Sequence, residues 1–150
     1  PSRPRPGSPE HAGMVPAKRG PELARATRGD KGPCPAVCLA TLKAIPYEAA
    51  KAMLHREHGF TGNGLWRRQC VAMMQQHFGP CTVREPSGSN VATAVRVFFA
   101  GGKSGAVCDR GHIMPVVRGR LMNAHFKSHT IRQIETVIII DDDRDVKARA

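Results

Sequence analysis

Cys34 is the residue whose place in this sequence best suits nucleophilic chemistry. Pro35 follows it and fits the first turn of a helix, where its missing N–H leaves no donor unpaired, so we expect Cys34 at or next to a helix start. The unpaired N–H groups and partial positive charge of a helix start favour a thiolate and can hold an oxyanion. We therefore predict a lowered pKa and a nucleophilic role for Cys34, with an inert cysteine as the alternative.

A cysteine nucleophile needs a base, and the base needs an acceptor that orients it. His112 opens an expected strand after Gly111, and Asn123 lies on the next strand, beyond a turn at Arg118-Gly119. Paired antiparallel strands hold side chains side by side, so His112 and Asn123 can share one face. Cys34, His112 and Asn123 together would form a papain-type arrangement, although spacing alone favours an ordinary hairpin.

The other cysteines and histidines give no convincing metal site. The five cysteines are an odd number without regular spacing, and we expect most of them to be buried free thiols. Zinc needs three or four converging ligands, and neither Cys34-x3-Cys38 nor His55-x2-His58 has a second matching pair. We expect His77 to be a core residue with its polar atoms satisfied, and we predict neither a metal nor a cofactor.

The pattern of apolar residues predicts helices first and an antiparallel sheet after them, an α+β domain over residues 31–141. Glycine, proline and capping residues mark the boundaries of these elements. Expected helices cover 34–44, 46–59, 65–79 and 89–102, and expected strands cover 81–85, 104–108, 112–117, 120–124 and 131–140.

Residues 1–30 read as an extended basic, proline-rich arm, and residues 142–150 read as a charged tail. Twenty-three Lys and Arg against 12 Asp and Glu give the chain a net charge of +11. Such a balance favours a polyanionic partner, although a basic surface that aids solubility is an equal alternative. The candidate residues for contacts with nucleic acid or a protein partner are Arg3, Arg5, Lys18, Arg19, Arg25 and Arg28.

No apolar run reaches the length of a membrane span, and the N-terminal stretch does not read as a signal peptide. We therefore expect the protein to act inside a cell, or to be packaged from there.

The stretch PCPAVCLATLKAIPYEAAKAML resembles the N-terminal motif of small papain-like cysteine-peptidase-fold proteins encoded by phages and prophages. Cys34 falls on the cysteine of that motif, and residues 46–48 fall on its Pro-Tyr-Glu. The later stretch GHIMPVVRGRLMNAH resembles the Gly-His strand of the same proteins, which is followed by a Gly turn and an Asp. His112 and Asn123 fall on its polar positions. The resemblance spans residues 31–125 and departs at Pro33, where Asp or Asn is common.

The resemblance implies a papain-like α+β fold and hydrolysis of a peptide, isopeptide or related amide bond. Cys34 would attack, His112 would exchange the proton and Asn123 would orient the imidazole. No Gln precedes Cys34 to complete a papain-like oxyanion hole, since the first Gln of the chain is Gln69.

The alternative is a non-catalytic structural component of a phage particle, in the capsid, the tail or the interior. It would keep the fold and bind other particle subunits or DNA through its basic arm, in the host cytoplasm or in the virion. A DNA-binding module is a third candidate, although the sequence offers no recognisable reading helix.

Overall fold

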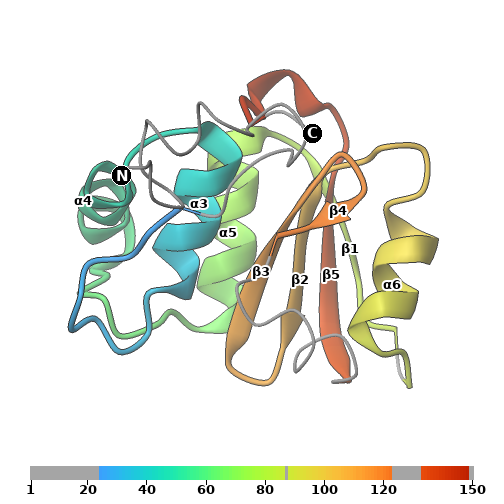
Figure 1. The fold of residues 1–150 in the computed structure, drawn as a ribbon, viewed down its shortest axis with the longest axis horizontal. Coiled ribbons are helices and arrows are strands. Elements are labelled where there is room, and N and C mark those ends of the chain that lie inside the picture. Colours follow the sequence, from blue (N-terminus) through green and yellow to red (C-terminus); the bar gives the residue numbers. More distant parts are fainter. Residues whose placement is uncertain (1–23, 87, 123–132, 149–150) are drawn as a thin grey trace, which may run out of the picture.

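The computed structural model describes residues 24–86, 88–122 and 133–148, and within these ranges the chain has a mixed α+β fold with four α-helices and a five-stranded antiparallel sheet (Figure 1). The predicted α+β class is thereby confirmed. Residues 1–23 of the expected arm, and Asn123, lie outside the described residues. The elements are α3 (Cys34–Lys43), α4 (Tyr47–His58), α5 (Arg67–Phe78), β1 (Cys81–Arg84), α6 (Val91–Phe98), β2 (Gly105–Asp109), β3 (His112–Val117), β4 (Arg120–Leu121), β5 (Ile134–Ile140) and the 3-10 helix η1 (Asp143–Asp145).

These elements follow the boundary residues that the sequence provides. Gly59 ends α4 in the left-handed conformation that glycine adopts without strain. Asn90 caps α6, because its side chain accepts a hydrogen bond from the backbone N–H of Thr93 at 2.8 Å. The last helix is shorter than predicted, since it ends at Phe98 and is followed by Gly101 and Gly102, both with positive φ.

The strand order is β1-β5-β2-β3-β4, so the last strand in the chain lies inside the sheet, between β1 and β2. Helices α3, α4 and α5 lie on one side of the sheet, and α6 lies on the other (Figure 1). Side chains of β2 alternate between the two cores, with Ala106 and Cys108 on the α3 side and Val107 on the α6 side. Strands β2, β3 and β5 are therefore buried on both faces, while β1 and β4 at the edges are partly exposed.

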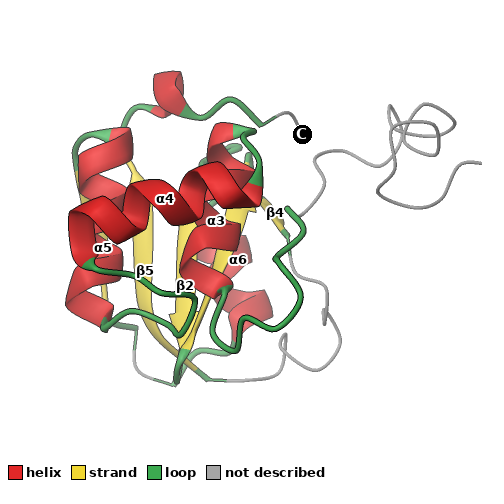
Figure 2. Cartoon of the chain, turned by 90° about the vertical axis from the view of Figure 1, so that its left-hand side faces the viewer, coloured by secondary structure: helices red, strands yellow, loops and turns green. Residues whose placement is uncertain are grey.

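Helix α3 is the innermost helix of its layer. It packs on β3 and is covered on its outer side by α4, which crosses in front of it in Figure 2. Because it has neighbours on opposite sides, its residues are apolar almost all round, and Ala36, Cys38, Leu39 and Leu42 have no exposed surface. This packing fixes the start of α3, and with it Cys34, against the start of β3.

The segment after β5 returns to the same layer. Backbone N–H groups of Lys147 and Ala148 donate to the Leu42 carbonyl at 2.9 and 3.3 Å, and the side chains of Val146 and Ala148 are buried. The C-terminal end of α3 is thus held by this segment, while its N-terminal end points toward the site. Among the described residues, no helix has the length and apolar character that crossing a bilayer would require.

Candidate active site

Cys34 and His112 are in contact at the junction of α3 and β3. The Cys34 Sγ lies 2.7 Å from His112 Nδ1 and 3.9 Å from Nε2. Cys34 is the first residue of α3 and His112 is the first residue of β3, and both side chains are half-buried. The thiol is therefore within proton-transfer distance of an imidazole that comes from 78 residues further along the chain.

The predicted lowering of the Cys34 pKa is wrong. Burial raises the pKa of this thiol to about 11, and the negative charge of Asp109 adds to the rise, while hydrogen bonds from the backbone N–H groups of Ile113 and Cys34 oppose it. The helix start is a weaker donor site than expected, because Pro33 and Pro35 carry no N–H and the Val37 N–H already donates to the Pro33 carbonyl at 2.9 Å. The thiol therefore needs a base in order to ionise near neutral pH.

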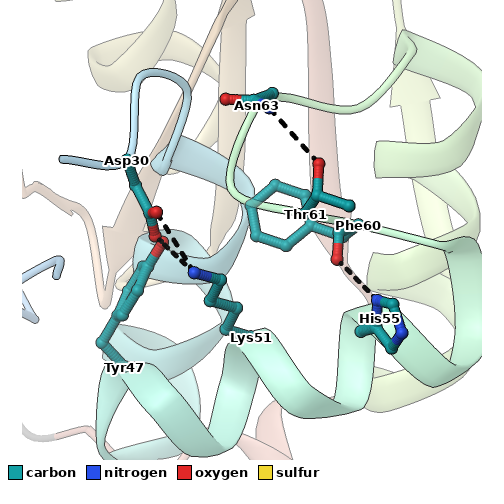
Figure 3. Close-up of polar contacts among 7 residues, drawn as sticks. All are labelled: Asp30, Tyr47, Lys51, His55, Phe60, Thr61 and Asn63. Atoms are coloured by element: carbon teal, nitrogen blue, oxygen red, sulfur yellow. Dashed lines mark hydrogen bonds and ion pairs between the residues drawn. The ribbon is translucent and has the colours of Figure 1, made fainter.

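A polar cluster fixes the segment that leads into Cys34. The Asp30 carboxylate accepts hydrogen bonds from the Tyr47 hydroxyl and from Lys51 Nζ, the latter at 3.0 and 3.1 Å, so α4 holds this segment (Figure 3). Hydrogen bonding by Tyr47 and Lys51 lowers the pKa of Asp30, so the carboxylate is charged at neutral pH.

Close backbone packing holds the same segment against the loop that follows α4. The Gly32 N–H donates to the Gly62 carbonyl at 2.8 Å, and Gly32 and Asn63 form an isolated β-bridge. A Cβ on Gly32 would lie 2.7 Å from the Asn63 carbonyl carbon and from the Gly64 nitrogen, so no larger residue fits without movement. The two chain segments beside Cys34 therefore pack as one unit.

A cleft of about 610 Å³ opens at the Cys34–His112 pair. Trp66 stands in its wall with 71% of its surface exposed, an uncommon state for a tryptophan. A cleft of this size can hold several residues of an extended peptide or a similar ligand. Its wall is formed by Gly32, Cys34, Pro35, Asn63, Gly64, Leu65, Trp66, Arg67, Gln69, Cys70, Cys108, Asp109, Gly111, His112 and Ile113.

Two residues of this wall were missed as site residues in the sequence. Asp109 ends β2 directly opposite His112 in the β2–β3 register and is only 2% exposed. Its signal was the string Asp-Arg-Gly-His, a two-residue turn flanked by an acid and an imidazole, but the predicted strand ended one residue too early. Gln69 follows Cys34 in the chain, yet it reaches the same cleft from α5, where its Oε1 accepts from the Trp66 N–H at 2.9 Å.

The other four cysteines are free thiols, as predicted; Cys38, Cys70 and Cys108 are buried and Cys81 is half-buried. Burial raises the pKa of Cys70 and Cys81 to about 11 and that of Cys108 to about 12, and it raises the pKa of Cys38 well above its ordinary value. Among the described residues, Cys34 is the cysteine whose sulfur lies within hydrogen-bond distance of a histidine, at 2.7 Å from His112 Nδ1. The other four thiols, Cys38, Cys70, Cys81 and Cys108, therefore read as packing residues.

The remaining histidine and basic candidates lie as follows. His77 Nε2 contacts Glu57 Oε1 at 2.7 Å, so its ring is satisfied as expected, and His55 Nδ1 contacts the Phe60 carbonyl at 3.1 Å (Figure 3). Arg25 and Arg28 are exposed before α3. Across residues 24–86, 88–122 and 133–148, no three His, Cys, Asp or Glu side chains converge on a point that could hold a metal ion. The candidates that lie outside the described residues are Arg3, Arg5, Lys18 and Arg19.

In comparisons with protein-family models, curated proteins and solved structures, nothing matches this chain significantly. Its class is therefore defined by its own fold and site: an α+β protein with a thiol–imidazole contact at the mouth of a cleft.

Proposed function

We propose that this protein is a thiol-dependent hydrolase of peptide, isopeptide or related amide bonds, built on a papain-like arrangement. The observation that carries the proposal is the 2.7 Å contact between Cys34 Sγ and His112 Nδ1 in the wall of an open cleft. A nucleophile at a helix start and a base on a distant strand are the two groups that acyl transfer to cysteine requires. The exposed indole of Trp66 offers a surface on which an extended chain can lie.

In the first half of the reaction, His112 Nδ1 takes the thiol proton while the Cys34 sulfur attacks the carbonyl carbon. A base is necessary here, because burial keeps the pKa of the thiol at about 11. The carbonyl oxygen becomes an oxyanion, and the Cys34 N–H at the start of α3 is a donor for it. The imidazolium then gives its proton to the leaving amine, and a thioester to Cys34 remains.

In the second half, water attacks the thioester carbon and His112 takes a proton from that water. A second tetrahedral oxyanion collapses, the carbon–sulfur bond breaks and the sulfur recovers its proton from the imidazolium. The products are an amine and a carboxylic acid, and the protein returns to its starting state. The cycle needs no other reactant than water.

Alkylation of Cys34 by iodoacetamide tests the pair without a known substrate. The full chain is compared with His112→Gln, and the site of reaction is identified by mass spectrometry. Because Cys34 and Cys38 lie between the same two lysines, Lys31 and Lys43, the experiment is repeated in a Cys38→Ala background. Removal of a general base typically costs two to four orders of magnitude, so we expect Cys34 alkylation near neutral pH to fall at least about tenfold. Equal rates in chains with the same thermal unfolding would contradict the proposal.

The second candidate function is that of a non-catalytic component of a phage particle, and the net charge of +11 favours it. In this case the partner is a polyanion or another particle subunit, and binding to DNA weakens steeply as salt rises. Titration of a DNA duplex with the full chain and with Cys34→Ala distinguishes the two functions. Salt-sensitive binding that is unchanged in Cys34→Ala, together with equal alkylation of wild type and His112→Gln, would favour the particle component over the hydrolase.

A further inference from the structure

We propose that the cleft selects acidic peptide segments, with an apolar side chain of the segment packed on Trp66 and its carboxylates beside cations at the cleft mouth. The inference rests on the proposed function, because it names the substrate class of the same site. Binding of such a segment can be measured without catalysis, so the two proposals can fail separately.

Trp66 is an exposed apolar side chain on a fixed backbone. Among the described residues, the large apolar side chains that remain exposed are Trp66, at 71%, and Val97 on α6. The Trp66 N–H donates to Gln69 Oε1 at 2.9 Å, and the Trp66 carbonyl accepts from the backbone N–H groups of Gln69 and Cys70 at 2.9 and 3.0 Å. An indole on so fixed a backbone loses little conformational freedom when a ligand covers it.

The cleft wall beside Trp66 suits one apolar side chain of a peptide. Pro35, Leu65 and Ile113 line the same cleft and add apolar surface to it. Trp66 is the single tryptophan of the chain, and no Phe or Tyr is among the described residues that line the cleft. Single-stranded nucleic acid is held by stacking successive bases on several aromatic side chains. The wall therefore fits a peptide better than a row of bases.

Cations without an acidic partner stand around the cleft mouth. Lys31, Arg68 and Arg110 are exposed, and each is adjacent in the chain to residues that line the cleft. Within residues 24–86, 88–122 and 133–148, none of the three forms an ion pair with an acidic side chain. They come from the segment before α3, the first turn of α5 and the β2–β3 turn, so positive charge reaches the mouth from three elements.

The acidic side chains of the cleft wall and its neighbouring segments are compensated or buried. Glu135 forms an ion pair with Arg67, and the Asp30 carboxylate accepts from Lys51 Nζ. Asp109 is 2% exposed, so it barely reaches the solvent. The mouth therefore attracts the carboxylates of an acidic peptide and repels a lysine-rich one.

The net charge of +11 attracts anions to the whole surface, so the test needs a control that removes equal charge elsewhere. Arg84, Arg96 and Lys103 provide it, because they are exposed and neither line the cleft nor neighbour a residue that does. A triple alanine variant of these residues has the same net charge as a triple alanine variant of the mouth cations Lys31, Arg68 and Arg110.

Binding of the peptide acetyl-Glu-Glu-Phe-Gly-Glu-Glu-amide to full-length Cys34→Ala, which cannot form a thioester, tests the inference. The matched controls are the same peptide with every Glu replaced by Gln or by Lys. Because Trp66 is the single tryptophan, its fluorescence emission reports on the cleft. In salt of about 0.15 M, which screens distant charges, we expect the Glu peptide to shift this emission and to bind about tenfold more tightly than the Gln peptide. The Lys peptide should bind more weakly than either.

Three sets of variants, made in Cys34→Ala and checked by their unfolding midpoints, locate the binding. Lys31→Ala/Arg68→Ala/Arg110→Ala should lose most of the preference for the Glu peptide. Arg84→Ala/Arg96→Ala/Lys103→Ala, with the same net charge, should keep it. Trp66→Ala, measured by the fluorescence anisotropy of dye-labelled peptides, should bind the Glu and Gln peptides several-fold more weakly.

Four results would overturn the inference. They are equal affinity for the Glu and Lys peptides, an equal loss in the two triple variants, no binding of the Glu peptide, and tighter binding of a short oligothymidine at Trp66, which would make single-stranded nucleic acid the ligand. Emission that changes with protein concentration alone would instead identify a second copy of the chain as the occupant and would also overturn it.

The proposed function is judged separately, by Cys34 alkylation in wild type and His112→Gln. If the Glu peptide does not bind while alkylation depends on His112, the substrate class is wrong and the hydrolase stands. If the peptide binds selectively while both chains are alkylated equally, the hydrolase is wrong and the cleft remains a binding site for acidic peptides.

Discussion

Cys34 is subject to opposing influences, and their balance decides how it can react. Burial and the charge of Asp109 favour the neutral thiol, whereas the backbone N–H groups of Ile113 and Cys34 favour the thiolate, and burial dominates because the pKa rises to about 11. The contact with His112 provides a second way to form the thiolate despite the raised pKa, because a proton passed from Sγ to Nδ1 stays inside the site. The residue is thus a thiol whose ionisation depends on its partner.

The pH dependence of alkylation separates these two routes to the thiolate. We expect wild-type Cys34 to show a pH-independent rate near neutrality, from proton transfer to His112, and a second rise at alkaline pH. In His112→Gln the first phase disappears, and the rate climbs about tenfold per pH unit toward a midpoint near the pKa of about 11. The measurement is the iodoacetamide rate at Cys34 from about pH 6 to pH 10, with glutathione as a free-thiol reference. A midpoint below that of glutathione in His112→Gln would show that the helix start outweighs burial.

At the scale of elements, three boundaries meet at the site: the start of α3, the loop after α4 and the β2–β3 turn. The first two are joined by Gly32, whose α-carbon faces backbone atoms of Asn63 and Gly64. The hydrogen bonds of Tyr47 and Lys51 to Asp30 hold the same segment against α4 (Figure 3). Cys34 is therefore positioned by the contacts that the segment before it makes with α4 and with the loop after α4.

Gly32→Ala should disturb both stability and reactivity. The added methyl would lie 2.7 Å from two backbone atoms, closer than any carbon contact tolerates, so the segments must separate. We expect a loss of about 1–3 kcal/mol in the free energy of unfolding, as for other overpacked sites. We also expect slower Cys34 alkylation near neutral pH. Urea denaturation and the iodoacetamide rate measure the two effects, and Lys31→Ala, at the exposed preceding residue, is the control. An unchanged urea midpoint in Gly32→Ala would mean that the contact is not tight in solution.

The elements themselves were largely predictable, because their signals are local. Pro35, Pro46, Gly59 and Asn90 mark helix boundaries through backbone chemistry that acts within one turn. The insertion of β5 between β1 and β2 was not predictable, since β2, β3 and β5 are all buried and largely apolar, so the sequence does not show which strands pair. The pKa of Cys34 was also out of reach, because it depends on burial by residues distant in the sequence.

On the scale of the whole molecule, α3, α5 and β2 bring several unpaired thiols into one packed core. Cys38, Cys70 and Cys108 are at most 5% exposed and belong to the core cluster between the sheet and helices α3–α5, with half-buried Cys34 at its edge. Burial raises the pKa of all four thiols. A folded state that holds its thiols protonated, while the unfolded chain does not, must lose stability in alkaline solution.

Cys38 gives the cleanest test of this linkage, because it is fully buried and lies one helical turn from Cys34. In the unfolded chain a thiol loses its proton near pH 9, whereas folded Cys38 keeps its proton well above that, so the folded state binds more protons and stability falls as pH rises. Each such thiol contributes a slope of at most about 1.4 kcal/mol per pH unit. We expect the free energy of unfolding, from urea titrations in a reducing buffer, to decline less steeply above about pH 9 in Cys38→Ala than in wild type. Val107→Ala removes core volume without a titrating group, so it should lower the whole curve and leave its slope unchanged. Parallel curves for Cys38→Ala and wild type would show that the thiol at this position does not couple to folding.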